Sequence, residues 1–144
     1  MRVLVQRVTK SSVKVDNKIV GSINKGLNVL VGFTNTDNDQ TIEYMAKKVA
    51  NLRIFNDENG IMNKSVIDIS GQILCISQFT LYADANKGNR PSYIAAASGE
   101  VAKPLYEKFL ATLNNYVKTE HGIFGAHMDV EIQNDGPITI FIEK

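Results

Sequence analysis

The strongest constraint on the fold is a pattern near the C-terminus, where two alternating stretches flank an Asn-Asp-Gly-Pro sequence. Residues 128–133 alternate between apolar and polar side chains, and isoleucine occupies every second position of residues 138–142. A period of two on both sides of turn residues predicts two β-strands joined by a tight hairpin. Pro137 removes a backbone donor where the second strand begins. The Gly136-Pro137 pair then projects bare carbonyl oxygens from a rigid hairpin, although an ordinary turn explains the same residues.

Length and composition predict one globular domain covering residues 1–144. A chain of 144 residues can bury a sizeable core, but it leaves little room for two domains. The hydrophobic fraction of 44% and the charged fraction of 22% are ordinary for soluble proteins. A net charge of +1 without a dense basic run neither requires nor excludes a polyanionic partner, so any contact with RNA needs a local patch.

Cysteine usage and the lack of long apolar runs predict a cytoplasmic protein outside the membrane. The single cysteine, Cys75, allows no intramolecular disulfide, which suits a reducing compartment. Residues 1–7 are too short and too interrupted for a signal peptide. No apolar run approaches the ~20 residues that are needed to span a bilayer.

The first third of the chain predicts a β meander. Alternating or apolar segments at 2–8, 11–15, 18–23 and 27–33 are separated by short polar turns. Arg7 lies among apolar residues of the first segment. Because arginine is rarely buried, we expect it to be a solvated residue at a sheet edge.

Two principal helices are predicted, together with a short one. From Thr41 to about Leu52, apolar residues recur at helical spacing, and Asp37 or Asp39 is positioned to cap this helix. A second helix is expected from near Pro104, which a first turn tolerates, to about Val117. Small residues at 92–97 indicate a short helical segment before it. These patterns alone predict an α/β domain.

The segment 72–82 combines an apolar first half with a polar second half. The first half predicts a central strand that is covered on both faces. If the strand continues regularly, Ser77 and Phe79 share one face, and Gln78 and Thr80 share the other. Hydroxyl and amide groups at the end of a stiff strand are typical of a functional site. A strand that simply emerges into solvent explains the pattern equally well.

The familiar catalytic constellations are absent. His121 and His127 lie in a loop without cysteine or spaced histidine partners, so we expect no metal site. Cys75 lies between apolar residues and reads as a buried hydrophobe. Ser77 and Thr80 have no visible base to activate them as nucleophiles. Any hydrolysis must therefore depend on positioning and on backbone donors.

A glycine- and lysine-containing loop at 83–90 follows the polar segment. Lys87 and Arg90 could contact phosphates from this loop. A solvated loop without a ligand is the simpler interpretation of the same residues.

Five motifs taken together closely resemble the D-aminoacyl-tRNA deacylase family. They occur in order along the whole chain, and only the ordered set is specific. They are Arg2–Val8, Ser77–Leu81, Gly88–Ser92, Phe124–Val130 and Asn134–Thr139.

The resemblance implies a fold, an activity and an assembly. The implied fold is mixed α+β, with layered, mainly antiparallel, barrel-like β-sheets and two principal helices packed on one side. The implied activity is hydrolysis of the ester of D-aminoacyl-tRNA, and of misattached glycine, without a metal or organic cofactor. Members of the family are homodimers in which a cis Gly-Pro pair, here Gly136-Pro137, enters the active site of the partner subunit. Local sequence alone favours trans, since only about 5–6% of X-Pro bonds in folded proteins are cis.

The resemblance also assigns catalytic roles to residues 77–80. An aminoacyl ester is already activated, so held water and N–H donors to the developing oxyanion could suffice. We place these donors at the backbone of Gln78, Phe79 and Thr80, and we expect Ser77 to seat the terminal adenosine. Thr80 is a candidate nucleophile, but an orienting role for it is preferred. Lys87 and Arg90 are weak candidates for tRNA contact.

Chiral selection is assigned to rigid carbonyls of Gly136 and Pro137. They would receive the ammonium group of the substrate and leave no room for an L side chain, whereas a D side chain or glycine meets no obstacle. Asn134, Thr139 and Met128 complete the expected binding residues. Under this interpretation Arg7 braces the motif from below, which replaces the solvated-edge expectation.

Two other functions remain open at this point. One is a non-catalytic module that binds tRNA ends, with the hairpin serving as a dimer contact. The other is a freestanding relative of the editing domain found on some archaeal threonyl-tRNA synthetases, which would remove L-serine. Measuring whether the protein cleaves D-aminoacyl esters, L-aminoacyl esters or neither distinguishes these two functions from D-aminoacyl-tRNA deacylation.

Overall fold

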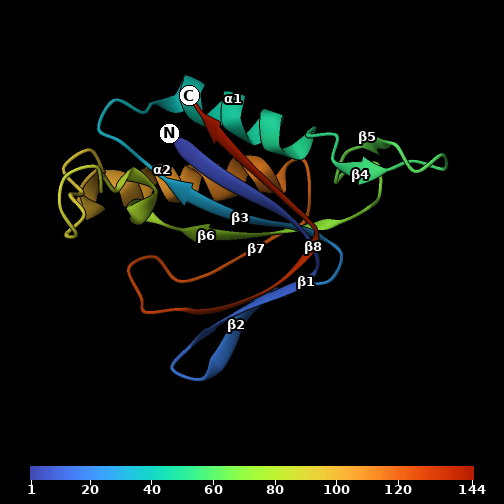
Figure 1. The fold of residues 1–144 in the computed structure, drawn as a ribbon, viewed down its shortest axis with the longest axis horizontal. Helices are drawn as coiled ribbons and strands as arrows, with labels where there is room; N and C mark the ends of the chain where they lie inside the picture. Colours follow the sequence, from blue (N-terminus) through green and yellow to red (C-terminus); the bar gives the residue numbers. More distant parts are fainter.

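A computed structural model describes residues 1–144 and consists of a six-stranded mixed sheet, a small two-stranded sheet and two long helices (Figure 1). The elements in chain order are β1 (Arg2–Val15), β2 (Lys18–Ile23), β3 (Gly26–Gly32), α1 (Asp39–Ala50), β4 (Phe55–Asn56), β5 (Met62–Lys64), β6 (Gln72–Ser77), the 3-10 turn η1 (Phe79–Tyr82), α2 (Gly99–Asn114), β7 (Thr119–His121) and β8 (Asp129–Glu143).

The long strand β1 organises the sheet. Its first half pairs antiparallel with β3, its second half with β2, and nearly its whole length with β8. The predicted segments 2–8 and 11–15 are therefore a single strand, because β8 pairs with both. Beyond β3 the sheet continues through the parallel neighbours β6 and β7. The mixed α+β fold with a mainly antiparallel sheet and two helices is confirmed.

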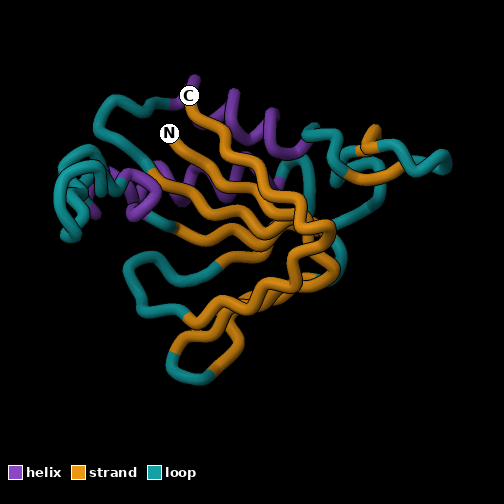
Figure 2. Tube along the Cα trace, in the orientation of Figure 1, coloured by secondary structure: helices purple, strands orange, loops and turns teal.

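The sheet curls until its two ends approach each other, and both faces carry a hydrophobic cluster. A Cβ added to Gly21 of β2 would lie only 2.7 Å from His121 O of β7, so these strands are nearly in contact. In Figure 2 the strands bend together, and the lower half turns away from the helices. The larger cluster lies between the sheet and both helices, and the smaller one lies inside the curl.

Helix α1 forms where its apolar spacing predicts, but a different residue caps it. Ile42, Met45 and Val49 are fully buried on one face. The Asn38 side chain accepts hydrogen bonds from the Gln40 and Thr41 amides, so neither Asp37 nor Asp39 is the cap. No helix in the structure is both long enough and apolar enough to cross a membrane.

The second half of the chain corrects two further expectations. Helix α2 begins five residues before Pro104, which therefore lies inside the helix rather than in its first turn. Residues 92–97 are irregular rather than helical: Ser92 forms a β-bridge with Asp84, and only residues 94–96 form a turn and a bend. Backbone hydrogen bonds between Asp84 and Ser92, both 2.8 Å, begin this irregular segment.

The predicted hairpin at 134–137 is wrong. Strand β8 runs straight through this sequence because both of its halves pair with β1 in the same direction. Gln6 pairs with Thr139 and Val8 with Asn134, so Arg7 alone faces the four residues 135–138, which form a bulge. The Gly136-Pro137 peptide bond is cis, and both residues are exposed.

Candidate active site

A cavity of about 510 Å³ opens where β3 and β6 end and α2 begins. Its far wall is the segment that leads from β7 into β8. The walls are mainly apolar, and Ser77, Gln78 and His127 supply the polar side chains. The lining residues are Val31, Gly32, Phe33, Ile76, Ser77, Gln78, Phe79, Ala97, Gly99, Ala102, Phe124, Gly125, Ala126, His127, Met128 and Val130.

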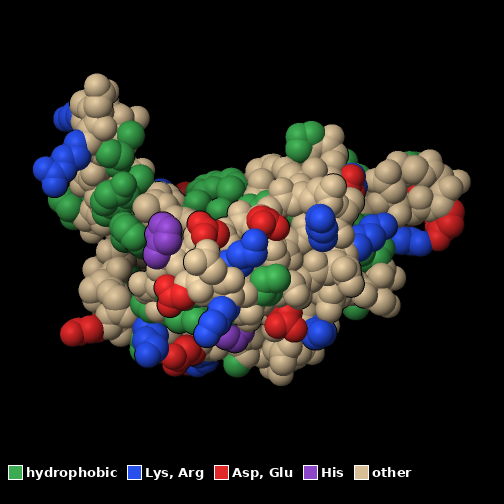
Figure 3. Space-filling view, turned by 90° about the horizontal axis from the view of Figure 1, so that it is seen from below, with side chains coloured by type: hydrophobic (Ala, Val, Ile, Leu, Met, Phe, Trp, Pro, Cys, Tyr) green, Lys and Arg blue, Asp and Glu red, His purple; other side chains and the backbone are tan.

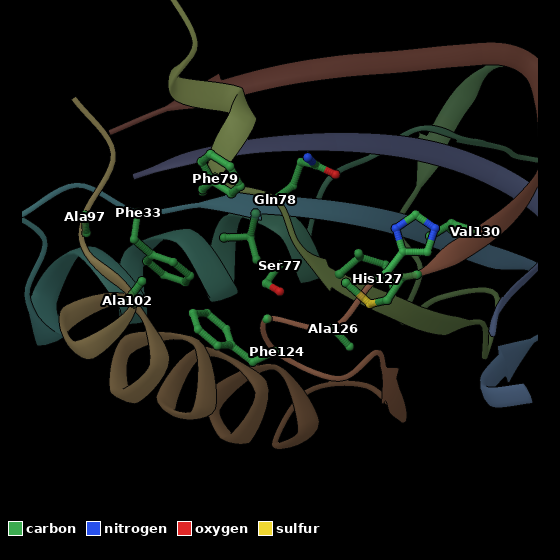
Figure 4. A pocket seen from close by; sticks show the side chains of 16 residues that line it. Phe33, Ser77, Gln78, Phe79, Ala97, Ala102, Phe124, Ala126, His127 and Val130 are labelled. Atoms are coloured by element: carbon green, nitrogen blue, oxygen red, sulfur yellow. The ribbon is translucent and has the colours of Figure 1, made fainter. Parts of the chain in front are cut away.

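Ser77 is the polar residue at the centre of the cavity. Figure 4 shows its hydroxyl pointing into the space above Phe124 and Ala126. Phe33 lies on one side of this space, and His127 lies on the other. Ser77 reaches this position because it is the last residue of β6, whose preceding residues are buried in the core.

After Ser77 the chain leaves the sheet, so the predicted continuous strand to Tyr82 is wrong. Gln78 is the turning residue, and Phe79–Tyr82 form the single 3-10 turn η1. The expected alternation of faces over residues 77–80 therefore does not occur. Figure 4 shows the Gln78 side chain directed away from Ser77.

This turn leaves two backbone amides without partners. The Gln78 amide donates to Val31 O across 2.7 Å, so it is not available to a substrate. The amides of Phe79 and Thr80 have no hydrogen-bond partner within the chain, as expected at the start of a helical turn. The set of candidate oxyanion donors thus reduces from three to two.

Glycine at position 32 lets the turn approach β3. A Cβ at Gly32 would lie 2.9 Å from Gln78 O and 3.3 Å from a ring carbon of Tyr82. Arg2 holds the same turn from the other side, because its Nη1 donates to Leu81 O across 3.0 Å. The free amides are therefore fixed to the sheet on two sides.

The side chain of Thr80 is occupied within the turn. Its hydroxyl oxygen accepts a hydrogen bond from the side-chain nitrogen Nε2 of Gln78, and Thr80 is not among the residues that line the cavity.

Cys75 and Tyr106 lie behind the cavity and are chemically inert. Burial raises the pKa of the Cys75 thiol and that of the Tyr106 phenol far above their ordinary values. The Tyr106 hydroxyl donates to Cys75 O across 2.9 Å. The prediction that Cys75 is a buried hydrophobe is confirmed. No cluster of His, Cys, Asp or Glu suited to a metal ion occurs.

The wall formed by residues 124–128 was incompletely predicted. Met128 lines the cavity as expected, and it lies against Gly122, where a Cβ would approach its sulfur to 2.4 Å. Phe124 and His127 line the cavity too but were not assigned to the site. Their place in the Phe124–Val130 motif, next to Met128, was the available signal.

The remaining predicted binding residues lie outside this cavity, at the β1–β8 bulge. Asn134 closes the bulge: its Nδ2 donates to Arg7 O across 2.9 Å and to Ile138 O across 3.0 Å. The Thr139 hydroxyl donates to Asn134 Oδ1. None of these residues, nor Gly136 or Pro137, lines the cavity of its own chain.

Arg7 is a buried brace rather than a solvated edge residue. Its side chain donates to Ile54 O across 2.8 Å. Its Nε lies 2.9 Å from Asp135 Oδ2, at an angle that makes the contact an ion pair without a hydrogen bond. Arg7 is therefore fixed to the bulge and to the chain before β4.

Lys87 and Arg90 are exposed in the loop that begins at Asp84 and ends at Ser92. They lie outside the cavity lining. The loop follows η1 directly, so it lies near the end of the sheet where the cavity opens.

Comparison with known proteins identifies the class of this protein. Residues 4–143 match the family described as D-Tyr-tRNA(Tyr) deacylase. Proteins named D-aminoacyl-tRNA deacylase from Clostridium acetobutylicum, Clostridium botulinum and Fervidobacterium nodosum are 53%, 56% and 54% identical, over 100% of this chain and 97% of each relative. The class is thus that of hydrolases acting on the ester of aminoacyl-tRNA.

Two solved structures share the fold of this chain. One titled c-Myc DNA Unwinding Element Binding Protein has a TM-score of 0.95 and 42% identity, covering 100% of this chain and 99% of that chain. A probable eukaryotic D-amino acid tRNA deacylase has a TM-score of 0.83 at 17% identity, covering 98% and 97%, and shares the fold. The chain belongs to the D-Tyr-tRNA(Tyr) deacylase family.

Proposed function

We propose that the protein hydrolyses the ester bond of D-aminoacyl-tRNA, and of mischarged glycyl-tRNA, in the cytoplasm where charged tRNA occurs. Residues 1–144 would act as one catalytic domain. Family membership supports the reaction. The single structural observation that carries it is the pair of consecutive unpartnered amides of Phe79, which lines the Ser77 cavity, and of Thr80, the next residue of η1.

The chemistry requires little beyond positioning. Water adds to the ester carbonyl, and the oxygen of that carbonyl becomes an oxyanion that the amides of Phe79 and Thr80 receive. The carbon–oxygen bond to the ribose then breaks, and the ribose oxygen takes a proton. Removal of one such donor in other hydrolases costs about 10²–10³ in rate. The apolar walls of Phe33 and Phe124 exclude bulk water, and the Ser77 hydroxyl binds the adenosine.

Selection by Gly136 and Pro137 requires a second copy of the chain. These two residues are exposed and lie outside the cavity of their own chain. Asn134 and Arg7 hold the bulge that carries them, so their carbonyls present a fixed surface. In a homodimer this bulge would enter the cavity of the partner and exclude an L side chain, which points where the carbonyls lie.

Hydrolysis of matched esters tests the activity. Purified protein is incubated with D-Tyr-tRNA, L-Tyr-tRNA and Gly-tRNA, and the remaining ester is measured. Loss of the D- and glycyl-esters with retention of the L-ester is expected. Binding of all three without turnover would indicate a non-catalytic tRNA-end module. Cleavage of L-seryl-tRNA would indicate an L-serine editing domain.

Complementation between two defective chains tests the shared site. Ala126→Trp fills the cavity, and Gly136→Val disturbs the bulge, where φ is +114° and a Cβ would lie 2.7 Å from Ile138. Each variant alone is expected to be inactive. Randomly paired mixtures should regain about a quarter of wild-type activity, because half of the dimers carry one intact site of two. No recovery in mixtures proven to exchange subunits would contradict the shared site.

A further inference from the structure

An exposed aromatic pair lies at the mouth of the cavity and is not used by the reaction described above. Phe79 and Tyr93 pack edge to face, with ring centroids 5.1 Å apart and an interplanar angle of 69°. Phe79 is 57% exposed and Tyr93 is 40% exposed, and the adjoining Ile94 is 92% exposed. Large apolar side chains that gather on a surface mark an interaction site more often than isolated ones do.

The pair connects the cavity with a basic loop. Phe79 lines the cavity, whereas Tyr93 follows the loop closed by the hydrogen bonds between Asp84 and Ser92. Lys87 and Arg90 are exposed on this loop. Its one carboxylate, Asp84, accepts hydrogen bonds from Asn86, so the cations are left to other partners. Figure 3 shows basic and hydrophobic side chains together on the lobe that projects from this end of the molecule.

We propose that Tyr93 is a stacking platform for the nucleotide that precedes the terminal adenosine of the RNA, with Lys87 and Arg90 binding its phosphates. This inference rests on the proposed function, because the ester in the Ser77 cavity fixes where the terminal adenosine lies. Phe79 lines the cavity, so a strand that leaves it along η1 passes the aromatic pair. An exposed aromatic face beside cations is the arrangement by which proteins hold single-stranded nucleic acid without reading its sequence.

The edge-to-face contact explains why Tyr93 is suited to this role. In an edge-to-face pair Phe79 covers at most one face of the Tyr93 ring, and Tyr93 is partly exposed, so a face of the tyrosine ring is left for a base. Stacking on such a ring contributes about 1–3 kcal/mol per base. Tyr93 therefore contributes to binding of the polynucleotide, whereas the backbone amides of η1 act on the ester.

Kinetics on two substrates test the proposal. Tyr93→Ala is compared on D-Tyr-tRNA and on D-tyrosyl-adenosine, which lacks the preceding nucleotide. We expect KM for D-Tyr-tRNA to rise about tenfold, within the range of one lost stacking contact, while KM for D-tyrosyl-adenosine and both kcat values stay unchanged. Tyr93→Phe should restore the tRNA KM. Tyr44→Ala, which removes a half-exposed tyrosine of α1, is the matched control.

The salt dependence of KM tests whether Lys87 and Arg90 bind phosphates. In Lys87→Ala/Arg90→Ala, the slope of log KM for D-Tyr-tRNA against log salt should become shallower by about 0.7 per lost phosphate contact. Lys47→Ala/Lys48→Ala on exposed positions of α1 should keep the wild-type slope.

Three outcomes would overturn the proposal. An equal rise of KM on both substrates would mean that Tyr93 shapes the cavity instead of binding the preceding nucleotide. An unchanged KM on both substrates would mean that Tyr93 has no role in binding. Dissociation of the Tyr93→Ala protein in gel filtration would assign this face to a subunit contact. If the wild type hydrolyses no D-ester, the proposed function fails. Binding of uncharged tRNA by the same variants then tests separately whether Tyr93 is a stacking platform.

Discussion

Asn134 Nδ2 donates a hydrogen bond to Ile138 O across 3.0 Å and thereby closes the bulge that carries Gly136 and Pro137. The same nitrogen donates to Arg7 O, so one side chain satisfies carbonyls on both strands. A bulge of four residues opposite one residue would otherwise leave these carbonyls unpaired in the ladder. The geometry of the proposed selector therefore depends on an amide that touches no substrate.

Replacing this amide should weaken the selector. Asn134→Ala removes the donors to Arg7 O and Ile138 O, and we expect the free energy of unfolding to fall by about 1–3 kcal/mol. We also expect slower hydrolysis of D-Tyr-tRNA and detectable hydrolysis of L-Tyr-tRNA. Thr139→Val removes only one of the two donors to Asn134 Oδ1, the other being Gln6 Nε2, and should have smaller effects. Undiminished rejection of the L-ester by Asn134→Ala would contradict this role.

Gly32 should be required for rate rather than for folding. In Gly32→Ala the new methyl group lies 2.9 Å from Gln78 O, which pushes η1 away from β3. A displacement of the amides of Phe79 and Thr80 near 1 Å should reduce kcat about 100-fold. Gly99→Ala adds the same group at the cavity with nothing within 4 Å, and it serves as the control. Steady-state kinetics give kcat for both variants, and circular dichroism shows whether both are folded. Equal kcat in both variants would contradict the proposal that the amides of Phe79 and Thr80 bind the oxyanion.

Thr80 should not act as a nucleophile. Thr80→Val keeps the shape of the side chain and the backbone amide, and it removes only the hydroxyl that accepts from Gln78. We expect kcat to fall by less than about tenfold, the cost of one lost hydrogen bond. Single-turnover rates with D-Tyr-tRNA measure this. Near-total loss of turnover with intact binding would restore a covalent mechanism.

Cys75 should influence stability at high pH but not catalysis. Burial raises the pKa of its thiol in the folded state, whereas the unfolded thiol ionises near its ordinary value of 9.0. Its contribution to stability is therefore complete below pH 9 and declines as the pH rises above 9, because the unfolded state alone then loses a proton. In Cys75→Ala the decline of unfolding free energy between pH 8 and pH 10 should be shallower, with unchanged deacylation. Rapid reaction of the native thiol with a thiol reagent would contradict this burial.

Local sequence patterns predicted the helices and the central strand because these features depend on nearby residues. Helix α1 follows from its apolar spacing, and β6 is buried on both faces as expected. The turn residues at 134–137 gave a misleading signal. Whether such residues reverse the chain or form a bulge depends on the partner strand, and β1 lies more than a hundred residues away in the sequence.

The site was predictable in its location but not in its geometry. The change from apolar to polar residues after Ile76 indicated a site, and Ser77 lines the cavity. Nothing local showed that Val31 would occupy the Gln78 amide, since that bond joins distant segments. Arg7 was misjudged on composition alone, because its burial depends on Ile54 O and Asp135, which only the fold brings together.

The groups that Phe79 and Thr80 would lend to the reaction are their peptide nitrogens, which every amino acid except proline also possesses. Side-chain replacement at either position therefore cannot delete the chemistry outright. Apart from substitution by proline, these two donors can be altered only through residues such as Gly32 that set the path of the chain. We expect substitutions at Phe79 and Thr80 to cost less catalytic rate than a substitution at Gly32, although Gly32 touches no substrate.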